Sequence, residues 1–215
     1  MNANSVPRIL IADHHRLLAE ACAKVLQPEF EVVQIVTDAR ALLQAALKYR
    51  PDAAIVDVFL PPLNGLDAVA TLKGHLSSLK LLFLSANPDP ALAAEAFRLG
   101  ASGYILQYSG AEEFTGAIRR VLRGQSYLSP LIARETMTYL LERPEQQKDR
   151  KRITRRQHAI LQLLAEGRAM KDIADVLDIA PGTVAFHKYK MMERLGITTN
   201  AGLLLYAMRQ QLIAA

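Results

Sequence analysis

Residues 171–195 read KDIADVLDIAPGTVAFHKYKMMERL, and this stretch decides how the C-terminal third of the chain folds. The first part predicts a helix with one apolar face, made of Ile173, Ala174, Val176 and Leu177. Pro181 cannot continue that helix, but it suits the first turn of a second one. The stretch therefore predicts two short helices joined by a tight turn.

The second predicted helix, from about Pro181 to Leu195, has two different faces. An inward stripe is made of Val184, Met191 and Leu195. The other side has no carboxylate before Glu193 and presents Ala185, Phe186, Tyr189 and Lys190. Such a face suits an anionic partner with apolar edges, because lysines bind phosphates and small or aromatic side chains contact thymine methyl groups. The pattern predicts binding to double-stranded DNA.

The expected DNA contacts are of two kinds. We expect phosphate contacts from Lys171, Thr183, Lys188 and Lys190, and base-edge contacts from Ala185, Phe186 and Tyr189. His187 fits a packed histidine better than a base reader. A helical bundle with a merely solvated outer face is the alternative that the two-helix pattern by itself leaves open.

The flanking residues distinguish these two readings. A helix opened by Thr154 carries the run LLAEG at 163–167, and the sequence LGI follows at 195–197. Over about residues 150–212, the chain resembles the DNA-binding domain of LuxR-type regulators. Ala180 stands where that family usually has a serine N-cap, and such a loss typically costs about 1 kcal/mol of helix stability.

Charge divides the chain into two parts. Its 215 residues allow one or two domains, and the formal net charge is +5. Residues 1–141 hold 13 Lys and Arg against 13 Asp and Glu, whereas residues 142–215 hold 13 against 8. A neutral front and a basic back suggest a sensor-like module joined to a nucleic-acid binder. We see no signal peptide or apolar run of 18 residues, so we expect a cytoplasmic protein that does not enter membranes.

Five short apolar segments alternate with helical patterns in the first 123 residues. The segments are Arg8–Ala12, Glu31–Val36, Ala53–Val56, Lys80–Leu84 and Gly103–Leu106. This alternation predicts a doubly wound α/β domain around a five-stranded parallel sheet, buried on both faces. We expect residues 124–152 to form a linker helix (130–141) and a charged tether, and residues 153–215 an all-α, four-helix helix-turn-helix domain.

Polar residues follow several of these predicted strands. Asp13 with His14, then Asp57, Ser85 and Gln107 stand at strand ends. The functional crevice of a doubly wound sheet lies at the carboxyl ends of its strands. We therefore expect these side chains to share one site.

Residues 6–123 resemble the receiver domain of two-component response regulators, which makes the whole chain similar to the LuxR-type (NarL/FixJ-like) response regulators. The matching residues include Asp13, Asp57, Pro61, Gly65, Ser85, Ala86, Gly103 and Tyr104. The resemblance implies that Asp57 accepts a phosphoryl group from a histidine kinase, that Ser85 bonds its oxygen, and that Tyr104 is a rotating aromatic switch. A half-buried structural aromatic is the other interpretation of Tyr104.

Two residues depart from the receiver pattern. His14 replaces the second acid that would hold Mg²⁺ with Asp13 and Asp57, and Gln107 replaces the lysine that would neutralise the phosphoryl group. Mg²⁺ prefers oxygen ligands, and each charge-assisted contact is worth roughly 1.5–3 kcal/mol. These departures favour a phosphorylation-independent regulator whose front domain binds a protein or ligand. His14 and His15 fit either a hydrogen-bonded pair or ligands of a nitrogen-preferring metal.

The last predicted helix bears on the oligomeric state, and the residue two positions after Asp57 bears on enzymatic activity. Residues 200–212 are apolar around much of the helix, which predicts a second copy as partner, unless the tether or the front domain covers them. A phosphatase with Asp57 as nucleophile often needs a second acid two residues on, but Phe59 stands there. We therefore expect a homodimeric regulator and not an enzyme.

Overall fold

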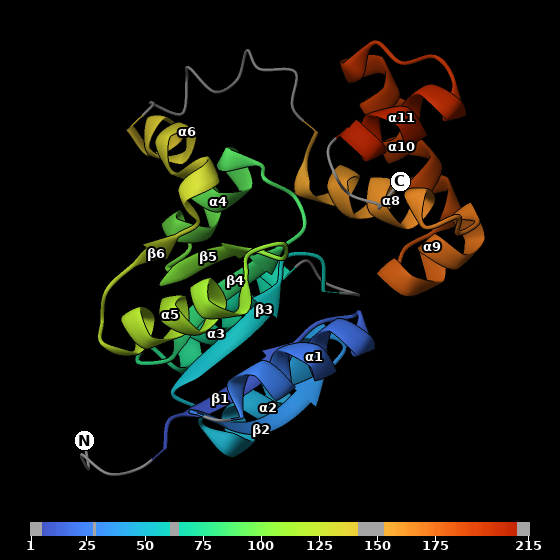
Figure 1. Cartoon of the computed structure of the whole chain (residues 1–215). Coiled ribbons are helices and arrows are strands. Elements are labelled where there is room, and N and C mark those ends of the chain that lie inside the picture. The colour runs from blue at the N-terminus through green and yellow to red at the C-terminus, as the bar shows by residue number, and fades with distance from the viewer. Residues whose placement is uncertain (1–5, 28, 61–64, 142–152, 210–215) are drawn as a thin grey trace.

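The computed structural model describes residues 6–27, 29–60, 65–141 and 153–209. They form an α/β sheet domain followed by a helical domain (Figure 1). The predicted charged tether at 142–152 lies outside the described residues.

A single parallel sheet forms the centre of the first domain. Its strands are β1 (Arg8–Ala12), β2 (Glu31–Val36), β3 (Ala53–Asp57), β4 (Lys80–Ser85), β5 (Gly103–Leu106) and β6 (Tyr127–Leu128). Their order is β2-β1-β3-β4-β5-β6, and each neighbouring pair is parallel. The five predicted strands are confirmed, but the predicted number was wrong because β6 was missed. A two-residue strand shows no periodicity, and β6 exists through backbone bonds such as Tyr127 N to Ser102 O.

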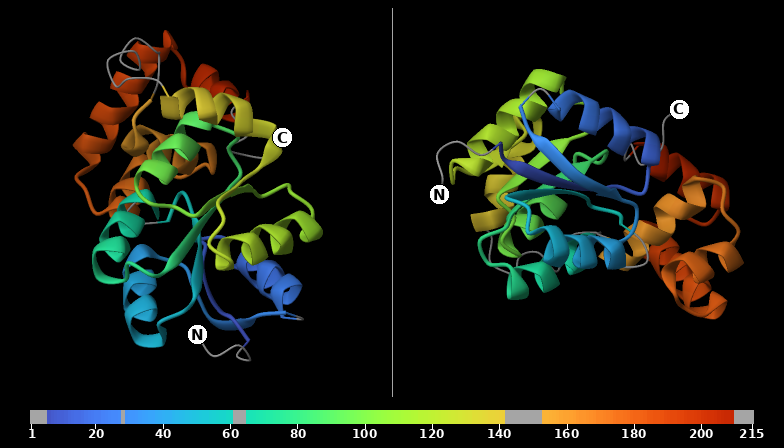
Figure 2. Two further views of the ribbon diagram at one scale, coloured as in Figure 1. Left: turned by 90° about the vertical axis from the view of Figure 1, so that its left-hand side faces the viewer. Right: turned by 90° about the horizontal axis from the view of Figure 1, so that it is seen from below.

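Helices cover both faces of this sheet (Figure 2). One face carries α1 (Arg16–Leu26) and α5 (Ala111–Leu122), and the other carries α2 (Ala39–Tyr49), α3 (Gly65–His75) and α4 (Pro90–Arg98). Alternate residues of β1 divide between the two cores: Ile9 and Ile11 pack with α1, whereas Leu10 and Ala12 pack toward α2. Burial on both sides explains the continuous apolar runs in the sequence.

Helix α6 (Pro130–Leu141) is the predicted linker helix. It packs against α4, where the guanidinium of Arg98 donates to the backbone oxygen of Tyr139 at 2.6 Å. Residues that precede the tether are therefore attached to the sheet domain.

The C-terminal domain has four helices in the described part of the chain: α8 (Arg155–Ala165), α9 (Met170–Leu177), α10 (Pro181–Leu195) and α11 (Asn200–Arg209). Thr154 and Gln157 form a reciprocal capping box at the start of α8. Helix α9 ends at Asp178, which has a left-handed backbone (φ 54°), and the N-cap Ala180 of α10 makes no side-chain cap bond. The tight turn and the lost cap are as predicted. Within the described ranges, no helix combines the length and apolarity needed to cross a bilayer.

Gly65, the first residue of α3, lies against the backbone at the end of β3. A Cβ at this position would overlap the backbone oxygen of Asp57, whereas a Cβ at Gly74, on the same helix, would meet no atom within 4 Å. We predict that Gly65→Ala lowers the free energy of unfolding by about 1–3 kcal/mol, because it overpacks a closed contact. Gly74→Ala should be neutral or stabilising by up to about 1 kcal/mol. Urea denaturation measures both, and equal effects of the two substitutions would contradict the close approach.

Candidate functional site

The carboxyl ends of the central strands bring three of the predicted site residues together. Asp13 follows β1, Asp57 ends β3, and Ser85 ends β4. Their exposed fractions are 1%, 3% and 0%. Three polar side chains buried at one edge of a parallel sheet form the site that the strand ends predicted.

His14 reaches into this site from the turn after β1. Its Nδ1 lies 2.5 Å from Asp57 Oδ2 and 3.9 Å from Asp13 Oδ1. The other oxygen of Asp57 accepts a bond from the backbone N–H of Phe59 at 3.2 Å. Both oxygens of the predicted phosphoacceptor are therefore engaged within the protein.

Among the described residues, only one of the two carboxylate oxygens of Asp13 has a hydrogen-bond partner. Its Oδ1 accepts a bond from the backbone N–H of His15 at 2.8 Å, while its Oδ2 is buried without a hydrogen-bond partner in the part of the chain that the structure describes. The His15 ring, with half of its side chain exposed, lies with Nδ1 3.5 Å from Asp13 Oδ1. Within the described residues, the buried Asp13 carboxylate therefore has one oxygen whose bonding capacity is unused.

Burial and charge shift the titration of this cluster. Burial raises the pKa of Asp57, and the nearby charge of Asp13 adds to that rise, although the bond to His14 opposes it. Burial by itself would lower the pKa of His14, but bonds to Asp57 and Glu166 and the charges of Asp57 and Asp13 together raise it to about 10. A protonated His14 therefore supplies positive charge to the site.

The residues present do not fit Mg²⁺. The predicted ligand set of Asp13, Asp57 and His14 places an imidazole nitrogen between two carboxylates, and Mg²⁺ binds oxygen ligands in near-octahedral geometry. The half-buried Gln107, at the end of β5, carries no charge to offset a phosphoryl group. Both departures from the receiver pattern thus stand at the carboxyl edge of the sheet, where the Gln107 backbone N–H donates to Ser85 O at 2.8 Å.

Ser85 and Tyr104 share a partner that the sequence did not suggest. The Ser85 hydroxyl accepts from the backbone N–H of Asn87 at 3.1 Å, and the Tyr104 hydroxyl donates to the Asn87 backbone oxygen at 3.4 Å. Tyr104 is fully buried, and burial raises its pKa. Asn87 was missed because the run NPDP at 87–90 is typical of a turn. In this structure the predicted switch residue lies inside the domain.

The helical domain contributes to the same site through α8. His14 Nε2 lies 3.3 Å from the amide nitrogen of Gln162 and 3.7 Å from Glu166 Oε1. The bond to His14 is the largest effect lowering the pKa of Glu166. The buried His158 ring stacks on Phe59 with centroids 5.5 Å apart. Helix α8 therefore lies over the carboxyl ends of the strands (Figure 1).

These contacts between domains were not predicted. The residues that meet are about 150 positions apart, and neither partner has a local pattern that names the other. A further contact joins Arg40 of α2 to Asp178 at the end of α9, at 3.3 Å between exposed side chains. An ion pair between exposed side chains adds little stability by itself. It is a second place where the helical domain contacts the sheet domain.

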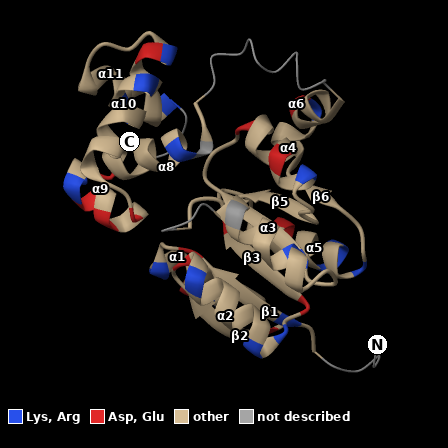
Figure 3. Ribbon diagram, turned by 180° about the vertical axis from the view of Figure 1, so that it is seen from behind, with Lys and Arg blue, Asp and Glu red and all other residues tan. Residues whose placement is uncertain are grey.

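The predicted DNA-contacting residues lie mainly on the open side of α9 and α10. Phe186 and Tyr189 are 59% and 62% exposed. Lys171 and Lys190 are also exposed, and Lys190 pairs with Glu193 at 3.1 Å. Figure 3 marks Lys and Arg positions along α8, α9 and α10.

Lys188 does not share that exposed face, and Thr183 and Ala185 are half-buried. Lys188 is 7% exposed, and its Nζ lies 5.5 Å from the Tyr189 ring centroid. The reason is helical periodicity, because residue 188 stands four positions after Val184 and three before Met191, both fully buried.

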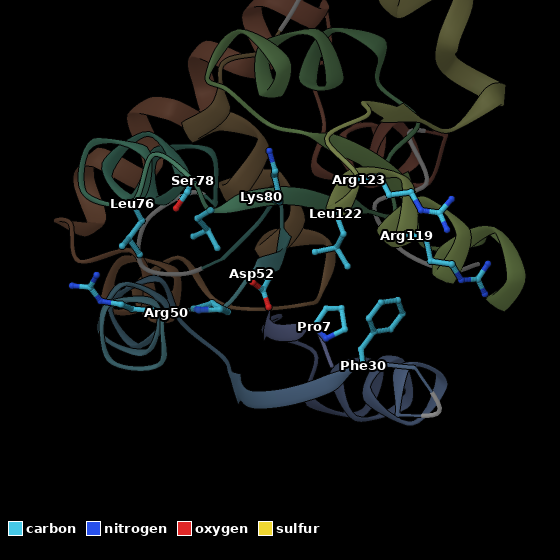
Figure 4. A pocket seen from close by; sticks show the side chains of 12 residues that line it. Pro7, Phe30, Arg50, Asp52, Leu76, Ser78, Lys80, Arg119, Leu122 and Arg123 are labelled. Atoms are coloured by element: carbon cyan, nitrogen blue, oxygen red, sulfur yellow. The ribbon is translucent and has the colours of Figure 1, made fainter. Parts of the chain in front are cut away.

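A separate hollow of about 790 Å³ lies at the opposite edge of the sheet (Figure 4). Its lining includes Pro7 before β1, Asp52 before β3 and Lys80 at the start of β4, all at the amino ends of strands. It has no residue in common with the cluster around Asp57. This hollow is therefore separate from the crevice at the carboxyl ends of the strands.

Comparisons with known proteins agree with the two-domain architecture. Residues 9–119 match the response regulator receiver domain, and residues 151–207 match the bacterial regulatory proteins of the luxR family. Receiver domains in general bind Mg²⁺ for phosphorylation. The predicted receiver-like and LuxR-type domains are confirmed.

Similar proteins match along nearly the whole chain. The transcriptional regulatory protein MctR of Rhizobium johnstonii is 30% identical over 96% of this chain and 95% of its own length. The response regulator GacA of Pseudomonas aeruginosa is 28% identical over 97% and 98%. Among solved structures, the RcsB response regulator of Salmonella typhimurium has a TM-score of 0.70 at 24% identity, covering 96% of this chain and 98% of that one. RcsB bound to promoter P1flhDC has a TM-score of 0.67 at 24% identity, covering 94% and 98%. At that identity, the solved structures support the fold.

The contact between His14 and Glu166 can be measured with a double-mutant cycle. We predict that His14→Gln and Glu166→Gln are non-additive, with a coupling of about 0.5–3 kcal/mol in urea denaturation, because the two side chains contact each other across the domains. Glu193→Gln, on α10, is the matched control and should add to His14→Gln within about 0.5 kcal/mol. Strict additivity of the first pair would contradict an energetic contact between His14 and Glu166.

Proposed function

The chain belongs to the LuxR family of response regulators, and we propose that its receiver domain controls DNA binding without Mg²⁺-dependent phosphorylation of Asp57. Relatives such as MctR and GacA carry the names of transcriptional and response regulators. The proposed role is that of a regulator rather than an enzyme.

The bond between His14 and Asp57 is the observation that carries the proposal. A carboxylate that accepts a phosphoryl group needs a free oxygen and positive charge to offset the incoming group. Here Oδ2 of Asp57 is bonded to His14, and Oδ1 accepts the N–H of Phe59. Phosphorylation would have to break the ion pair and would gain no lysine in return, because position 107 is glutamine.

Control is proposed to act on the position of the DNA-binding domain. Gln162 and Glu166 of α8 face His14, while Phe186 and Tyr189 of α10 remain exposed in the same structure. The described residues of the receiver domain leave these two side chains uncovered. The receiver domain contacts α8 through His14. In this proposal, that contact sets the orientation in which α10 is presented to DNA or to a second copy.

The proposed DNA interface follows the exposed face of the helical domain. Lys171, Thr183 and Lys190 are assigned to phosphates, and Phe186 with Tyr189 to base edges. Ala185 is assigned to the base edge beside them, whereas the buried Lys188 is left out. Since the partner is promoter DNA, we place the protein's action in the bacterial cytoplasm.

A homodimer is part of the proposal. Helix α11 exposes three large apolar side chains, Leu204, Leu205 and Met208, at 39%, 54% and 38%. A two-fold pair of helix-turn-helix domains reads two half-sites of a promoter. The described residues of the receiver domain do not cover these three side chains, so a second copy is the proposed partner.

Phosphodonor labelling tests the role of Asp57. We expect the wild-type chain, incubated with Mg²⁺ and acetyl phosphate, to remain unlabelled. The double variant His14→Asp with Gln107→Lys should become labelled, because it restores an oxygen ligand and a cation. Adding Asp57→Asn to that variant controls for the labelled residue, and labelling can be followed by intact-protein mass. Stoichiometric labelling of the wild type at Asp57 would refute phosphorylation-independent control.

Salt titrations of DNA binding test the interface. For Lys171→Ala or Lys190→Ala, we predict a weaker affinity on all sequences and a reduction of about 1 in the slope of log K against log salt concentration. Tyr189→Ala should instead cost about 1–3 kcal/mol at a defined base position. Lys48→Ala, exposed on α2, is the control and should change neither quantity. An unchanged slope in both lysine variants would place the DNA elsewhere.

A further inference from the structure

We propose that Asp13, His14, His15 and Asp57 form a binding site for a first-row transition-metal dication of the Zn²⁺ type. The site occupies the crevice already described, and the inference rests on the proposed function only for its coupling to DNA binding. The binding site itself is argued from the donor atoms, their burial and their chemistry.

Four potential ligand atoms converge in this crevice. Each residue offers one atom, and these atoms all lie within 4.8 Å of one another. His15 Nδ1 is 3.5 Å and His14 Nδ1 is 3.9 Å from Asp13 Oδ1. A tetrahedral ion with bonds of about 2.0–2.2 Å holds its ligands roughly 3.3–3.6 Å apart. The pair of His14 Nδ1 and Asp57 Oδ2, at 2.5 Å, would have to open, and pairs more than about 3.6 Å apart would have to close.

An unpartnered buried oxygen points independently to a ligand. Asp13 is 1% exposed, and its Oδ2 has no hydrogen-bond partner in the described structure. Buried polar atoms are nearly always bonded, so an exception of this kind calls for a missing partner. A cation between Asp13 and Asp57 would provide one and would offset the charge of two buried carboxylates.

The charge around His14 also favours a dication. Asp13 and Asp57 face its Nδ1, and Glu166 of α8 faces its Nε2. Glu166 also pairs with Arg168 at 3.3 Å, so the charges left to a single imidazolium are those of the two buried carboxylates, Asp13 and Asp57. Gln107, in the place of the family's lysine, offsets none.

The donor set selects the class of metal. Two imidazole nitrogens and two carboxylate oxygens suit Zn²⁺ and its neighbours Co²⁺, Ni²⁺ and Cu²⁺, whereas Mg²⁺ and Ca²⁺ take oxygen ligands. Half of the His15 side chain is exposed, which opens a path for the ion from solvent. The replacement of an acid by His14 thus converts an oxygen site into a mixed nitrogen and oxygen site.

His14 would connect the bound metal to the DNA-binding domain. A metal-ligating imidazole generally donates its other N–H to a carboxylate, which orients the ring. If Nδ1 binds the metal, Nε2 remains directed at Glu166, 3.7 Å away on α8. The entering ion displaces the proton between Nδ1 and Asp57, and that proton leaves to solvent. Metal binding in one domain would therefore change the contact that holds the other.

Metal titration of the full-length, tag-free chain tests the site after treatment with a chelator. We expect one equivalent of Zn²⁺ in calorimetry, one equivalent of Co²⁺ with visible d–d absorption, and no competition from millimolar Mg²⁺. His15→Gln should weaken Zn²⁺ binding by at least about 10–100-fold, the loss typical even of outer-shell changes, and Asp13→Asn by a similar factor. His75→Gln, exposed on α3, is the matched control and should leave the affinity unchanged.

Several results would overturn the proposal. These are the absence of Zn²⁺ binding, unchanged affinity in His15→Gln, or Mg²⁺ binding as tight as that of Zn²⁺. His15 makes no side-chain cap bond to α1, so its variant remains informative even if Asp13→Asn does not fold. DNA binding is measured on the same preparations. A chain that binds DNA but no metal refutes the metal site and leaves the proposed function standing. A chain that binds metal but no DNA refutes the proposed function and leaves the metal site standing.

Discussion

The ion pair between His14 and Asp57 is the interaction on which the site depends. Two carboxylates are buried at the carboxyl edge of the sheet, and a buried carboxylate is stable only when it is paired or bonded. His14 Nδ1 lies 2.5 Å from Asp57 Oδ2 and provides that pairing from inside the chain. His14 thereby places a positive charge beside the buried carboxylates from within the chain itself.

The same imidazole has two sides, and the second side links the domains. One ring nitrogen faces Asp57 and Asp13 of the sheet, and the other faces Glu166 and Gln162 of α8. The ring is rigid, so a change on one nitrogen alters the bond on the other. The chain from Asp57 through His14 to Glu166 is therefore a short physical connection between the receiver site and the helix that carries the DNA-binding domain.

Much of the fold could be predicted from the sequence, because its signals are local. Continuous apolar runs located β1 to β5, and Pro181 after Asp178 located the turn between α9 and α10. The structure differs from the local pattern at two places, where the sequence signal was too short or was outweighed by helical packing. The strand β6 has two residues, and Lys188 has a cationic side chain at a position that helical periodicity turns toward the core.

The sequence by itself determined the two domains, the strand ends that carry Asp13, Asp57 and Ser85, and the replacement of an acid by His14 and of a lysine by Gln107. Only the tertiary structure decided what His14 does there. The orientation of its ring depends on Asp57, 43 residues away, and on Glu166, about 150 residues away. Tertiary packing determines which distant residue becomes the partner of a titratable side chain. No periodicity or local motif in the sequence indicates that partner.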